Sequence, residues 1–400
     1  MQRVGGHGGG DLSDADLRRW RLLSQGLVGP GFPPDGDGAA KVVRRSGAVQ
    51  SQDHQPALWS LARRCCGPTG APPSEAVLGA AFDAAAFLRL HVLRPTWHFV
   101  PPERQRALIG LTGPRLAASL AGRWRELGLP AELLQQATDV LAGAIAEQGP
   151  LTRADAKEVL ERSGVGVEGQ RLPHLLMHAE LDGVLTSGPT RERQHTWALV
   201  PDRTPPPPAS PPPRDEVIRD LVLAFVRSHA PATERDLAWW AGLPLTVVRK
   251  GLEAARPEVD VLEAGGRRYW HAGPPRDPGA AAPAVHLVQS FDEYLVAHTE
   301  SRGLADPHGF AQHMPRGWLL GPGVLVDGVL TGHWRRVLSP RRVDVVVTPF
   351  VTLSPQVRSE LEAEAERYAA FVDRPLRLVL GDVLTPTRAA TSGPPMTSAG

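Results

Sequence analysis

The most regular pattern of polar and apolar positions occurs twice, once before and once after residues 204–214. In each copy a threonine is followed three residues later by an aspartate, Thr152 with Asp155 and Thr233 with Asp236. This spacing is typical of an acidic capping box, in which both side chains satisfy backbone N–H groups at a helix start. The acid also interacts favourably with the positive end of the helix dipole. Each copy therefore predicts a helix that begins after its threonine.

The elements expected around the two caps follow one order: a helix before the capped helix, another after it, and then a β-hairpin. They are expected at 133–147, 169–182 and 184–200 in the first copy, and at 216–228, 246–255 and 259–271 in the second. The first hairpin would turn around 191–194 and the second at Gly265-Gly266, because glycine pairs favour tight hairpin turns. Three short helices followed by a hairpin form the plan of a winged helix, so we predict two such domains here.

The two ends of the chain have weaker patterns. Helices at 14–25, 39–49 and 56–66, followed by a strand at 93–100, predict a further winged helix in the N-terminal part. After Pro278 the pattern changes to short β-rich runs. These runs lie at 285–289, 324–326, 342–348 and 376–380, with one helix at 354–372. We therefore predict a small β-rich domain in the C-terminal part.

The predicted fold class is α+β, with three tandem winged-helix domains and a C-terminal β-rich domain. The segment between the second and third winged helices contains two runs of prolines and is expected to be an extended, semi-rigid spacer. The predicted divisions are a disordered N-terminus at 1–10, winged helices at 11–118, 119–203 and 215–273, a proline-rich linker at 204–214, a β-rich domain at 274–385 and a disordered tail at 386–400.

Composition limits the class of protein. The chain has 400 residues, 42% of them hydrophobic, with 40 prolines and 41 glycines, which fits a multidomain globular protein with many connections. Its two cysteines, Cys65 and Cys66, are adjacent and cannot build a disulfide framework, which indicates a reducing compartment. The first residues lack an apolar signal segment, and no run approaches the roughly 18 apolar residues of a membrane span. We expect a cytoplasmic protein without a membrane partner.

Net charge and the residue types that can bind metals say less about function. A formal net charge of +1 does not by itself indicate a nucleic-acid binder. Arginine supplies nearly all the positive charge, which suits bidentate contacts to phosphate and guanine, although a GC-rich genome gives the same composition. The 14 histidines and two cysteines show none of the usual metal-ligand spacings, so we expect neither a metal nor another cofactor.

The triplet Gln50-Ser51-Gln52 places uncharged polar side chains where the surrounding pattern predicts a buried junction. Buried amides need hydrogen-bond partners or a functional role. Residues two apart lie on the same side of a strand but on nearly opposite sides of a helix, so the glutamines converge only if helical geometry stops near Val49. Pro56 and the polar residues before it favour such a stop. Another interpretation is that both amides only satisfy backbone groups at a helix end.

With its flanks, the triplet resembles the catalytic glutamine pair of a known family. The chain is similar to the winged helix DNA-binding domain superfamily that includes the AlkZ-like DNA glycosylases of the azinomycin-resistance type. Four further segments match in the same order and extend the resemblance over roughly residues 11–385. They are 93–100, 181–189, 291–295 and 326–335. Ser51 departs from the family pattern, because characterised members carry an aliphatic residue between the glutamines.

The resemblance implies a monofunctional DNA glycosylase that hydrolyses the N-glycosidic bond of N-alkylated or cross-linked purines. Such a purine already carries positive charge and leaves readily, so a placed water and little acid catalysis are enough. Gln50 and Gln52 would be the catalytic pair, with their carbonyl oxygens orienting the water and their amide nitrogens donating to phosphate or sugar oxygens. Asp53 is the alternative general base, because a carboxylate is the commoner water activator, and is otherwise a helix cap or an exposed turn residue.

Several residues are candidates for DNA contacts. Arg94, Thr96 and His98 alternate with apolar residues, so they would share the polar face of a strand, which could meet a phosphate or an abasic sugar. The other candidates lie on the two hairpin turns and on the helix before the second hairpin, where they could reach phosphates or a minor groove. They are Arg191, Arg193, His195, Arg249, Lys250, Arg267 and Arg268. The alternatives are solvated turn charges and, for His98, a buried histidine with satisfied hydrogen bonds.

We therefore expect a monomer that binds double-stranded, damaged DNA at the nucleoid. The competing hypothesis is a non-catalytic winged-helix DNA-binding protein such as a transcriptional regulator, because a fold does not fix a function. A regulator usually dimerises to match two half-sites, so a monomer favours the glycosylase. The acid pair Asp292-Glu293 is interpreted as a helix cap and family marker rather than as an acid/base pair.

Overall fold

The computed structural model describes residues 12–66, 70–273, 284–314 and 321–384. The segments predicted to be disordered, 1–10 and 386–400, lie outside the described residues. Helices and strands alternate irregularly along the chain, and the strands form separate sheets of two, three and five strands. The α+β prediction is therefore confirmed.

The N-terminal part begins with α1 (Asp14–Ser24), α2 (Gly36–Ser46), β1 (Val49–Gln50), α3 (His54–Arg64) and α4 (Glu75–Asp83). Strands β2 (Leu88–His91) and β3 (Trp97–Val100) complete an antiparallel sheet with the order β1-β3-β2. Three of these helices match the predicted ones, but α4 and β2 were not predicted. The helix predicted at 39–49 ends at Ser46, because Gly47 takes a positive φ of 79° and leads into β1.

The next part begins with a short 3-10 helix, η1 (Pro102–Arg104), and the long helix α5 (Gln105–Glu126). It continues with α6 (Ala131–Gln148), β4 (Leu151–Thr152), α7 (Arg153–Arg162), α8 (Arg171–Leu181), β5 (Leu185–Ser187), β6 (Thr196–Leu199) and α9 (Val200–Arg203). Thr152 and Asp155 form the predicted capping box of α7. The division predicted at 118/119 falls inside α5.

After the exposed segment 205–213, the chain forms α10 (Arg214–His229), α11 (Glu234–Ala241) and α12 (Leu245–Ala254). Thr233 and Asp236 form the predicted capping box of α11. Strands β7 (Asp260–Ala264) and β8 (Arg267–His271) then make a hairpin. Its turn contains Gly265 and Gly266 with φ of 53° and 71°, the left-handed conformation that this kind of two-residue turn requires.

The C-terminal part contains β9 (Val285–Val288), α13 (Glu293–Val296), the 3-10 helices η2 (Arg302–Leu304) and η3 (Phe310–His313), and β10 (Gly323–Val326). It ends with β11 (Val329–Leu338), β12 (Val343–Pro349), α14 (Pro355–Phe371) and β13 (Leu376–Leu380). The sheet order is β13-β12-β11-β10-β9, and β13 runs parallel to β12. The predicted strands are present, and β11 adds one that was not predicted.

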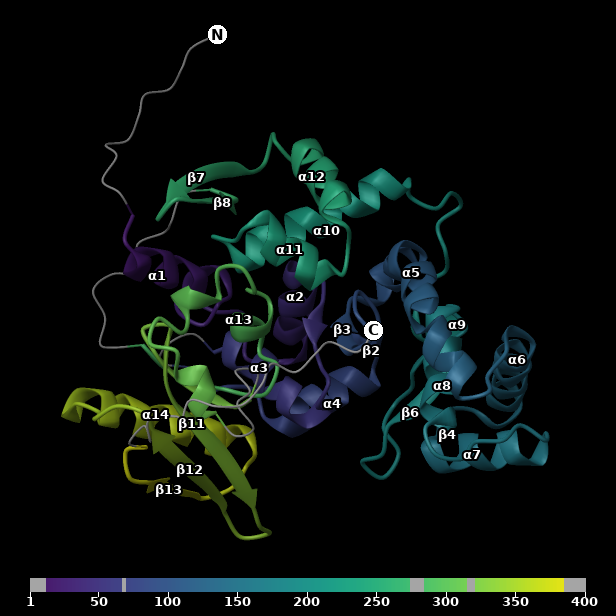
Figure 1. The fold of residues 1–400 in the computed structure, drawn as a ribbon. Helices are drawn as coiled ribbons and strands as arrows, with labels where there is room; N and C mark the ends of the chain where they lie inside the picture. Colours follow the sequence, from purple (N-terminus) through teal and green to yellow (C-terminus); the bar gives the residue numbers. More distant parts are fainter. Residues whose placement is uncertain (1–11, 67–69, 274–283, 315–320, 385–400) are drawn as a thin grey trace, which may run out of the picture.

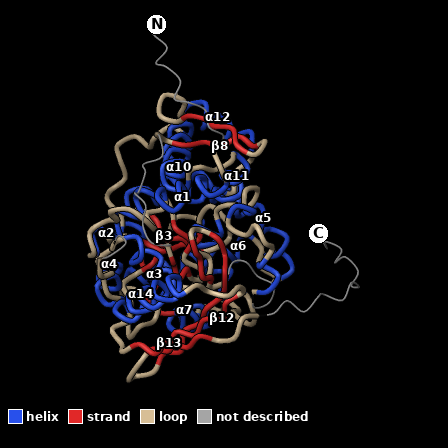
Figure 2. Tube along the Cα trace, turned by 90° about the vertical axis from the view of Figure 1, so that its left-hand side faces the viewer, coloured by secondary structure: helices blue, strands red, loops and turns tan. Residues whose placement is uncertain are grey.

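These parts are packed together in space. Figure 1 shows α1, α2 and α3 between the β7/β8 hairpin and the end of the large sheet formed by β12 and β13, with α6 and α7 to one side. Figure 2 again places β8 and α12 at one end and β12 and β13 at the other. One buried cluster joins α2, α3 and α4 with the large sheet and α14, and another joins β2 and α5 with α10, α11 and α12. The third large cluster is formed almost entirely by residues from one stretch of the chain, from α5 to β6.

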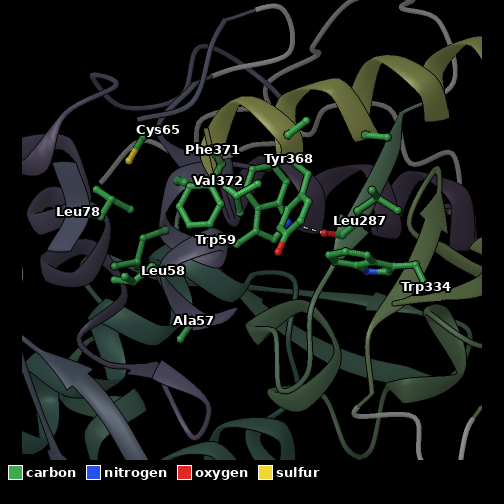
Figure 3. Close-up of a cluster of buried hydrophobic side chains, with 14 of the residues drawn as sticks. Ala57, Leu58, Trp59, Cys65, Leu78, Leu287, Trp334, Tyr368, Phe371 and Val372 are labelled. Carbon is green, nitrogen blue, oxygen red and sulfur yellow. Dashed lines mark hydrogen bonds between the residues drawn. The ribbon is translucent and has the colours of Figure 1, made fainter. Parts of the chain in front are cut away.

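The first cluster illustrates how the N-terminal and C-terminal parts depend on each other. Figure 3 shows Trp59 of α3 against Tyr368 and Phe371 of α14, with Trp334 of β11 nearby. The indole N–H of Trp59 donates a 2.7 Å hydrogen bond to the carbonyl oxygen of Leu287 in β9. Because Trp59 is 1% exposed, much of the apolar surface of α3 is buried only when the C-terminal sheet is in place.

The proline-rich segment does not separate two independent halves of the protein. Helix α10, which follows it, packs against α2 and α5 from the N-terminal half. The carboxylate of Glu364 in α14 likewise pairs with Arg63 in α3. In the parts of the chain that the structure describes, no helix is long and apolar enough to cross a membrane.

Candidate active site

The glutamine pair lies where the chain leaves α2 and enters the N-terminal sheet. Gln50 belongs to β1 and is opposite His98 of β3 in the antiparallel ladder. The helix has therefore ended before Val49, as convergence of the two glutamines requires. Gln50 is 3% exposed, whereas Gln52 lies two residues further on and is exposed. The pair thus extends from the protein interior to its surface.

The side-chain amide of Gln50 is held in one orientation. Its Oε1 accepts a 2.5 Å hydrogen bond from Nη2 of Arg94. Since a guanidinium can only donate, the amide oxygen rather than the nitrogen must face Arg94. Among the described residues no group bonds to Nε2 of Gln50. Gln50 therefore keeps its N–H donors, and one lone pair of its oxygen, for a ligand.

The backbone of Gln50 is held by Glu293, the first residue of α13. The backbone N–H of Gln50 donates to Oε1 of Glu293 at 2.5 Å. The other carboxylate oxygen, Oε2, accepts from the indole N–H of Trp240 at 2.8 Å and lies 3.0 Å from Nε2 of His229. Glu293 is 2% exposed, so its carboxylate is a buried charge that all three groups help to satisfy.

Glu293 is ionised despite its burial. Loss of hydration is the largest influence on its pKa and favours the neutral acid. The hydrogen bond and charge of His229, the N–H of Gln50 and the charge of Arg94 together outweigh that influence and lower the pKa of Glu293 to about 2. A negative charge therefore lies directly behind the backbone of Gln50 at neutral pH.

Arg94 closes this arrangement from the other side. Its Nη1 donates to the backbone oxygen of Trp240 in α11, while its Nη2 holds Gln50. Burial lowers the pKa of Arg94 to about 10, opposed by the charge of Glu293, so the guanidinium stays protonated near neutral pH. The loop between β2 and β3, which contains Leu93 and Arg94, lies close to the end of α11. A Cβ on Gly242, which has a φ of 61°, would lie 2.0 Å from the backbone oxygen of Leu93. Only glycine fits there.

The prediction that Arg94 and His98 contact DNA from the polar face of a strand is wrong. They are 8% and 0% exposed. The alternation fails because β3 begins only at Trp97, and two tight turns precede it, with hydrogen bonds of 2.7 Å from Arg94 N to Val92 O and from Thr96 N to Arg94 O. Thr96 is half-buried, and its hydroxyl has no hydrogen-bond partner among the described residues.

His98 is instead a buried histidine with satisfied nitrogens. Its Nδ1 lies 2.9 Å from the backbone oxygen of Thr96, and its Nε2 lies 3.3 Å from Nη2 of Arg94. An oxygen accepts and a guanidinium donates, so Nδ1 carries the proton and Nε2 accepts. Burial, followed by the charge of Arg94, lowers the pKa of His98 to about 3, so the ring is neutral. The alternative interpretation of this residue is therefore correct.

Gln52 faces the same loop as Gln50. Its Oε1 accepts a 3.3 Å hydrogen bond from the backbone N–H of Trp97, so its oxygen also faces the protein. Ser51 points elsewhere: it is fully buried, and its hydroxyl has no partner among the described residues. The backbone oxygens of Ser51 and Gln52 accept from Arg89 at 2.9 and 3.0 Å, and the guanidinium of Arg89 lies 3.4 Å from the centre of the Trp97 ring. Arg89 therefore holds the backbone of the triplet where it leaves β1.

Asp53 is the residue immediately before α3, and its side chain is exposed. Its side chain makes no hydrogen bond to the start of that helix, so it does not serve as a side-chain cap. Its carboxylate is adjacent to Gln52 in the chain and open to solvent.

The first hairpin turn contributes fewer accessible groups than expected. Arg191 and Arg193 are exposed at the turn, and Arg191 forms an ion pair with Asp155. His195 is half-buried instead, with its ring centre 5.3 Å from that of Trp97 and 4.6 Å from that of Trp197. Burial lowers the pKa of His195 well below its ordinary value. The prediction of a DNA contact by His195 at the hairpin tip is therefore not supported by its position.

The candidate residues on α12 and on the β7–β8 hairpin are accessible. Arg249 and Lys250 are exposed on α12, and Arg267 and Arg268 are exposed on β8. Arg249 forms an ion pair of 2.5 Å with Glu234. Together with Arg235 of α11, the three arginines line a cleft of about 410 Å³ that also contains Glu234, Glu300 and Trp270.

A sequence model of the family described as DNA glycosylase AlkZ-like matches residues 43–371. The chain belongs to the AlkZ-like DNA glycosylase family. It is 27% identical over 383 residues to the interstrand DNA cross-link repair glycosylase of Streptomyces sahachiroi, with 90% of this chain and 97% of that protein covered. It is also similar to the solved structure of the Streptomyces sahachiroi DNA glycosylase AlkZ, with a TM-score of 0.70 and 20% identity over 92% of this chain and 100% of that one.

Membership of the AlkZ-like family makes this protein a DNA glycosylase, an enzyme that cleaves the bond between base and sugar. The competing hypothesis of a non-catalytic regulator is therefore not supported. The likeness to the solved structure also agrees with the mixed α+β fold.

Sequence reasoning missed the main partner of Gln50 in this AlkZ-like glycosylase. Glu293 was treated as a helix cap, but Asp292 alone caps α13, by accepting from the N–H of Tyr294. Glu293 instead reaches a residue 243 positions earlier in the chain. The signal was an adjacent acid pair inside one of the segments that match the family. In the described ranges, no group of three or more histidine, cysteine, aspartate or glutamate side chains is placed to hold a metal ion.

Proposed function

We propose that this AlkZ-like glycosylase hydrolyses the N-glycosidic bond of N-alkylated or cross-linked purines with a water held by Gln50 and Gln52. The observation that carries the proposal is the fixed amide of Gln50, a buried glutamine whose oxygen is bound to Arg94 and whose nitrogen has no partner among the described residues. This nitrogen is not among the buried side-chain atoms that lack a partner, so it is accessible to a ligand.

The chemistry fits the side chains. A purine alkylated on a ring nitrogen is a cationic leaving group, so departure of the base needs little acid catalysis. The carbonyl oxygens of Gln50 and Gln52 each keep a second lone pair for a water hydrogen, and their amide nitrogens suit a phosphate or sugar oxygen. Holding the water near the anomeric carbon lowers the entropic cost of attack. The C–O bond forms as the C–N bond breaks, the base leaves as a neutral purine, and the proton of the attacking water passes to solvent, which reaches the site at the exposed Gln52. We propose a monofunctional reaction, because this route uses no amine nucleophile.

The name of one relative supports the substrate class. The Streptomyces sahachiroi protein is called an interstrand DNA cross-link repair glycosylase, and it aligns with 90% of this chain. We therefore include bulky and cross-linked purines among the substrates. We also propose that the protein acts as a monomer on duplex DNA at the nucleoid, without a cofactor.

The first test of the substrate class uses three duplexes. We expect single-turnover release of the adduct from a duplex with an N7-guanine nitrogen-mustard monoadduct, unhooking of the corresponding interstrand cross-link, and no release from undamaged DNA. Borohydride should trap no protein–DNA adduct, because no Schiff base forms. Binding to all three duplexes with no release from either damaged one would refute the proposed substrate class.

For DNA binding, we propose that the three groups of helices with their hairpins act as winged helices. The exposed arginines of β8 and α12, with Lys250, would contact phosphates, and Arg191 and Arg193 would do so from the other hairpin. The ion pair of Arg249 with Glu234 would have to open or be shared for such a contact. This proposal rests on the accessible charges that line the cleft between α11, α12 and the β7–β8 hairpin.

Arg267→Ala and Arg268→Ala should each weaken duplex binding uniformly across sequences. Each change removes one phosphate contact, so the slope of log affinity against log salt should become shallower by about 0.9. The measurement is the duplex Kd between about 50 and 200 mM salt. Arg377→Ala is the matched control, because Arg377 is an exposed arginine on β13, at the other end of the molecule (Figure 2). An unchanged slope in both β8 variants would remove this hairpin from the DNA interface.

A further inference from the structure

Gln50 is held by two opposite charges that come from different parts of the chain. Arg94, in the loop between β2 and β3, donates to its amide oxygen, and Glu293, in α13, accepts from its backbone N–H. Both charged side chains are at least nine-tenths buried. Burying a carboxylate and a guanidinium costs several kcal/mol of desolvation, which close pairing and hydrogen bonds must offset.

Some of these contacts serve folding, but folding alone does not determine which atoms of Gln50 are bonded and which remain available. A glutamine at a strand end can satisfy its amide with any backbone group. Here a donor-only partner on the side chain leaves Nε2 with no protein partner among the described residues. An acceptor-only partner on the backbone occupies the N–H of Gln50, so this N–H is not available to a ligand. The two charges thus determine which atoms of Gln50 remain available.

Glu293 also ties Gln50 to α11. Its second carboxylate oxygen accepts from the indole N–H of Trp240, whose backbone oxygen accepts from Arg94. Glu293, Trp240 and Arg94 therefore form a closed set of contacts around Gln50. Each member has two bonded neighbours in this set, so a shift of one member moves the others.

We propose that Glu293 and Arg94 are positioning residues that fix Gln50 in the orientation required for base release, with a lone pair of its Oε1 available to the water and its Nε2 hydrogens available to a phosphate or sugar oxygen. This inference rests on the proposed function of the glutamine pair. Neither residue touches DNA, because both are buried. Their effect is therefore confined to the rate of the chemical step.

Glu293→Gln tests the proposal with little change in side-chain shape. A glutamine has one acceptor oxygen, so its NH₂ group must face either the N–H of Gln50 or the indole N–H of Trp240, both of which can only donate. It also leaves Arg94 without its buried counter-charge. We expect the single-turnover rate constant for release of N7-methylguanine to fall at least about tenfold, with the duplex Kd unchanged within about threefold.

The matched control is Glu364→Gln. Glu364 is also a fully buried carboxylate with an arginine partner, Arg63, but its hydrogen bonds go to Arg63, Arg367 and the backbone of Leu287, and none goes to Gln50 or Arg94. It should lower stability without changing the rate constant at a temperature where both variants are folded. Equal rate constants in Glu293→Gln and Glu364→Gln would overturn the proposal.

Arg94→Lys provides a second, independent variant in case Glu293→Gln does not fold. Lysine keeps a positive charge beside Glu293 but lacks the planar fork that reaches both Gln50 and Trp240. With glutamine side chains labelled with ¹⁵N, the Nε2 signal of Gln50, assigned by its loss in Gln50→Ala, should shift in Arg94→Lys and remain unchanged in Glu364→Gln. Release should again fall at least about tenfold with duplex affinity kept.

The results separate this inference from the proposed function. If the unmodified protein releases no base, the proposed function fails and the positioning role fails with it. If the unmodified protein releases base and Arg94→Lys, or a folded Glu293→Gln, does so at the same rate, only the positioning role fails. A slower rate with equal duplex affinity and a shifted Gln50 signal would support both.

Discussion

Replacing Gln50 and Gln52 together by alanine is expected to lower the single-turnover rate of N7-methylguanine release by at least about 100-fold. The duplex Kd should stay within about threefold, because Gln50 is buried and Gln52 is a single neutral side chain at the surface. The physical reason is that the pair orients the water at the reacting sugar, so its loss removes the oriented nucleophile but leaves the phosphate contacts of the exposed arginines and Lys250. Release and binding are measured on the same duplex.

The control for this prediction is Gln135→Ala. Gln135 is exposed on α6 and bonds only to Asp139 of the same helix among the described residues, so its loss should change neither release nor binding. Circular dichroism and thermal unfolding establish that the double variant is folded. A double variant that is folded, binds the duplex and releases base at the normal rate would contradict the role of the pair.

Asp53→Asn separates the glutamine pair from its rival. Asp53 is exposed next to Gln52 and does not cap α3, so its carboxylate could take a proton from the water instead. If the glutamine pair places the water, Asp53→Asn should leave the release rate nearly unchanged. A loss comparable to that of the double glutamine variant would instead assign the base to Asp53.

Glu364→Ala is expected to lower the free energy of unfolding by about 3–5 kcal/mol, measured by urea denaturation. Glu364 is fully buried and bonds to Nε of Arg63 at 2.8 Å, so its loss leaves Arg63, which is 4% exposed, as a buried charge without its counter-charge. This pair joins α3 to α14, which lie at opposite ends of the sequence. The N-terminal part and the C-terminal sheet should therefore unfold in one transition.

The matched control is Glu161→Ala. Glu161 forms an exposed ion pair of 3.7 Å with Lys157 on α7, and such pairs contribute at most about 1 kcal/mol. A loss below about 1 kcal/mol in Glu364→Ala, or a separate transition for the C-terminal sheet, would mean that the shared core is not a unit of stability.

Local chemistry made several elements predictable. The capping boxes of α7 and α11 depend on residues three apart, and the β7–β8 turn depends on two adjacent glycines that adopt a positive φ. β11 was missed although its buried positions alternate, because Gly332 and His333 interrupt the apolar pattern. A Cβ on Gly332 would lie 2.8 Å from the oxygen of Thr348, so the glycine allows β12 to approach.

Long-range packing was not predictable. The division predicted at 118/119 falls inside α5, whose first half belongs to one buried cluster with α10 and α12, whereas its second half, with Trp124, belongs to another with α6 and α8. Nothing in the local sequence of α5 distinguishes the two surroundings. The proline-rich segment suggested two halves because its composition is visible locally in the sequence. The contact between α10 and α2, which joins the two halves, depends on residues far apart in the chain.

The candidate site was predictable only in part. The spacing of the two glutamines indicated that helical geometry must end before them, and alternation alone could not indicate that Arg94 and His98 face the interior. Glu293 could not be connected to Gln50 because the contact joins residues 243 positions apart. What remained visible in the sequence was the acid pair itself, which resembled a helix cap.

The most direct test of the whole account is the release of N7-methylguanine from a duplex by excess intact protein. We expect free base, an intact strand that carries an abasic site, and a rate well above spontaneous depurination. Tight binding of the duplex with release no faster than the spontaneous rate would contradict it.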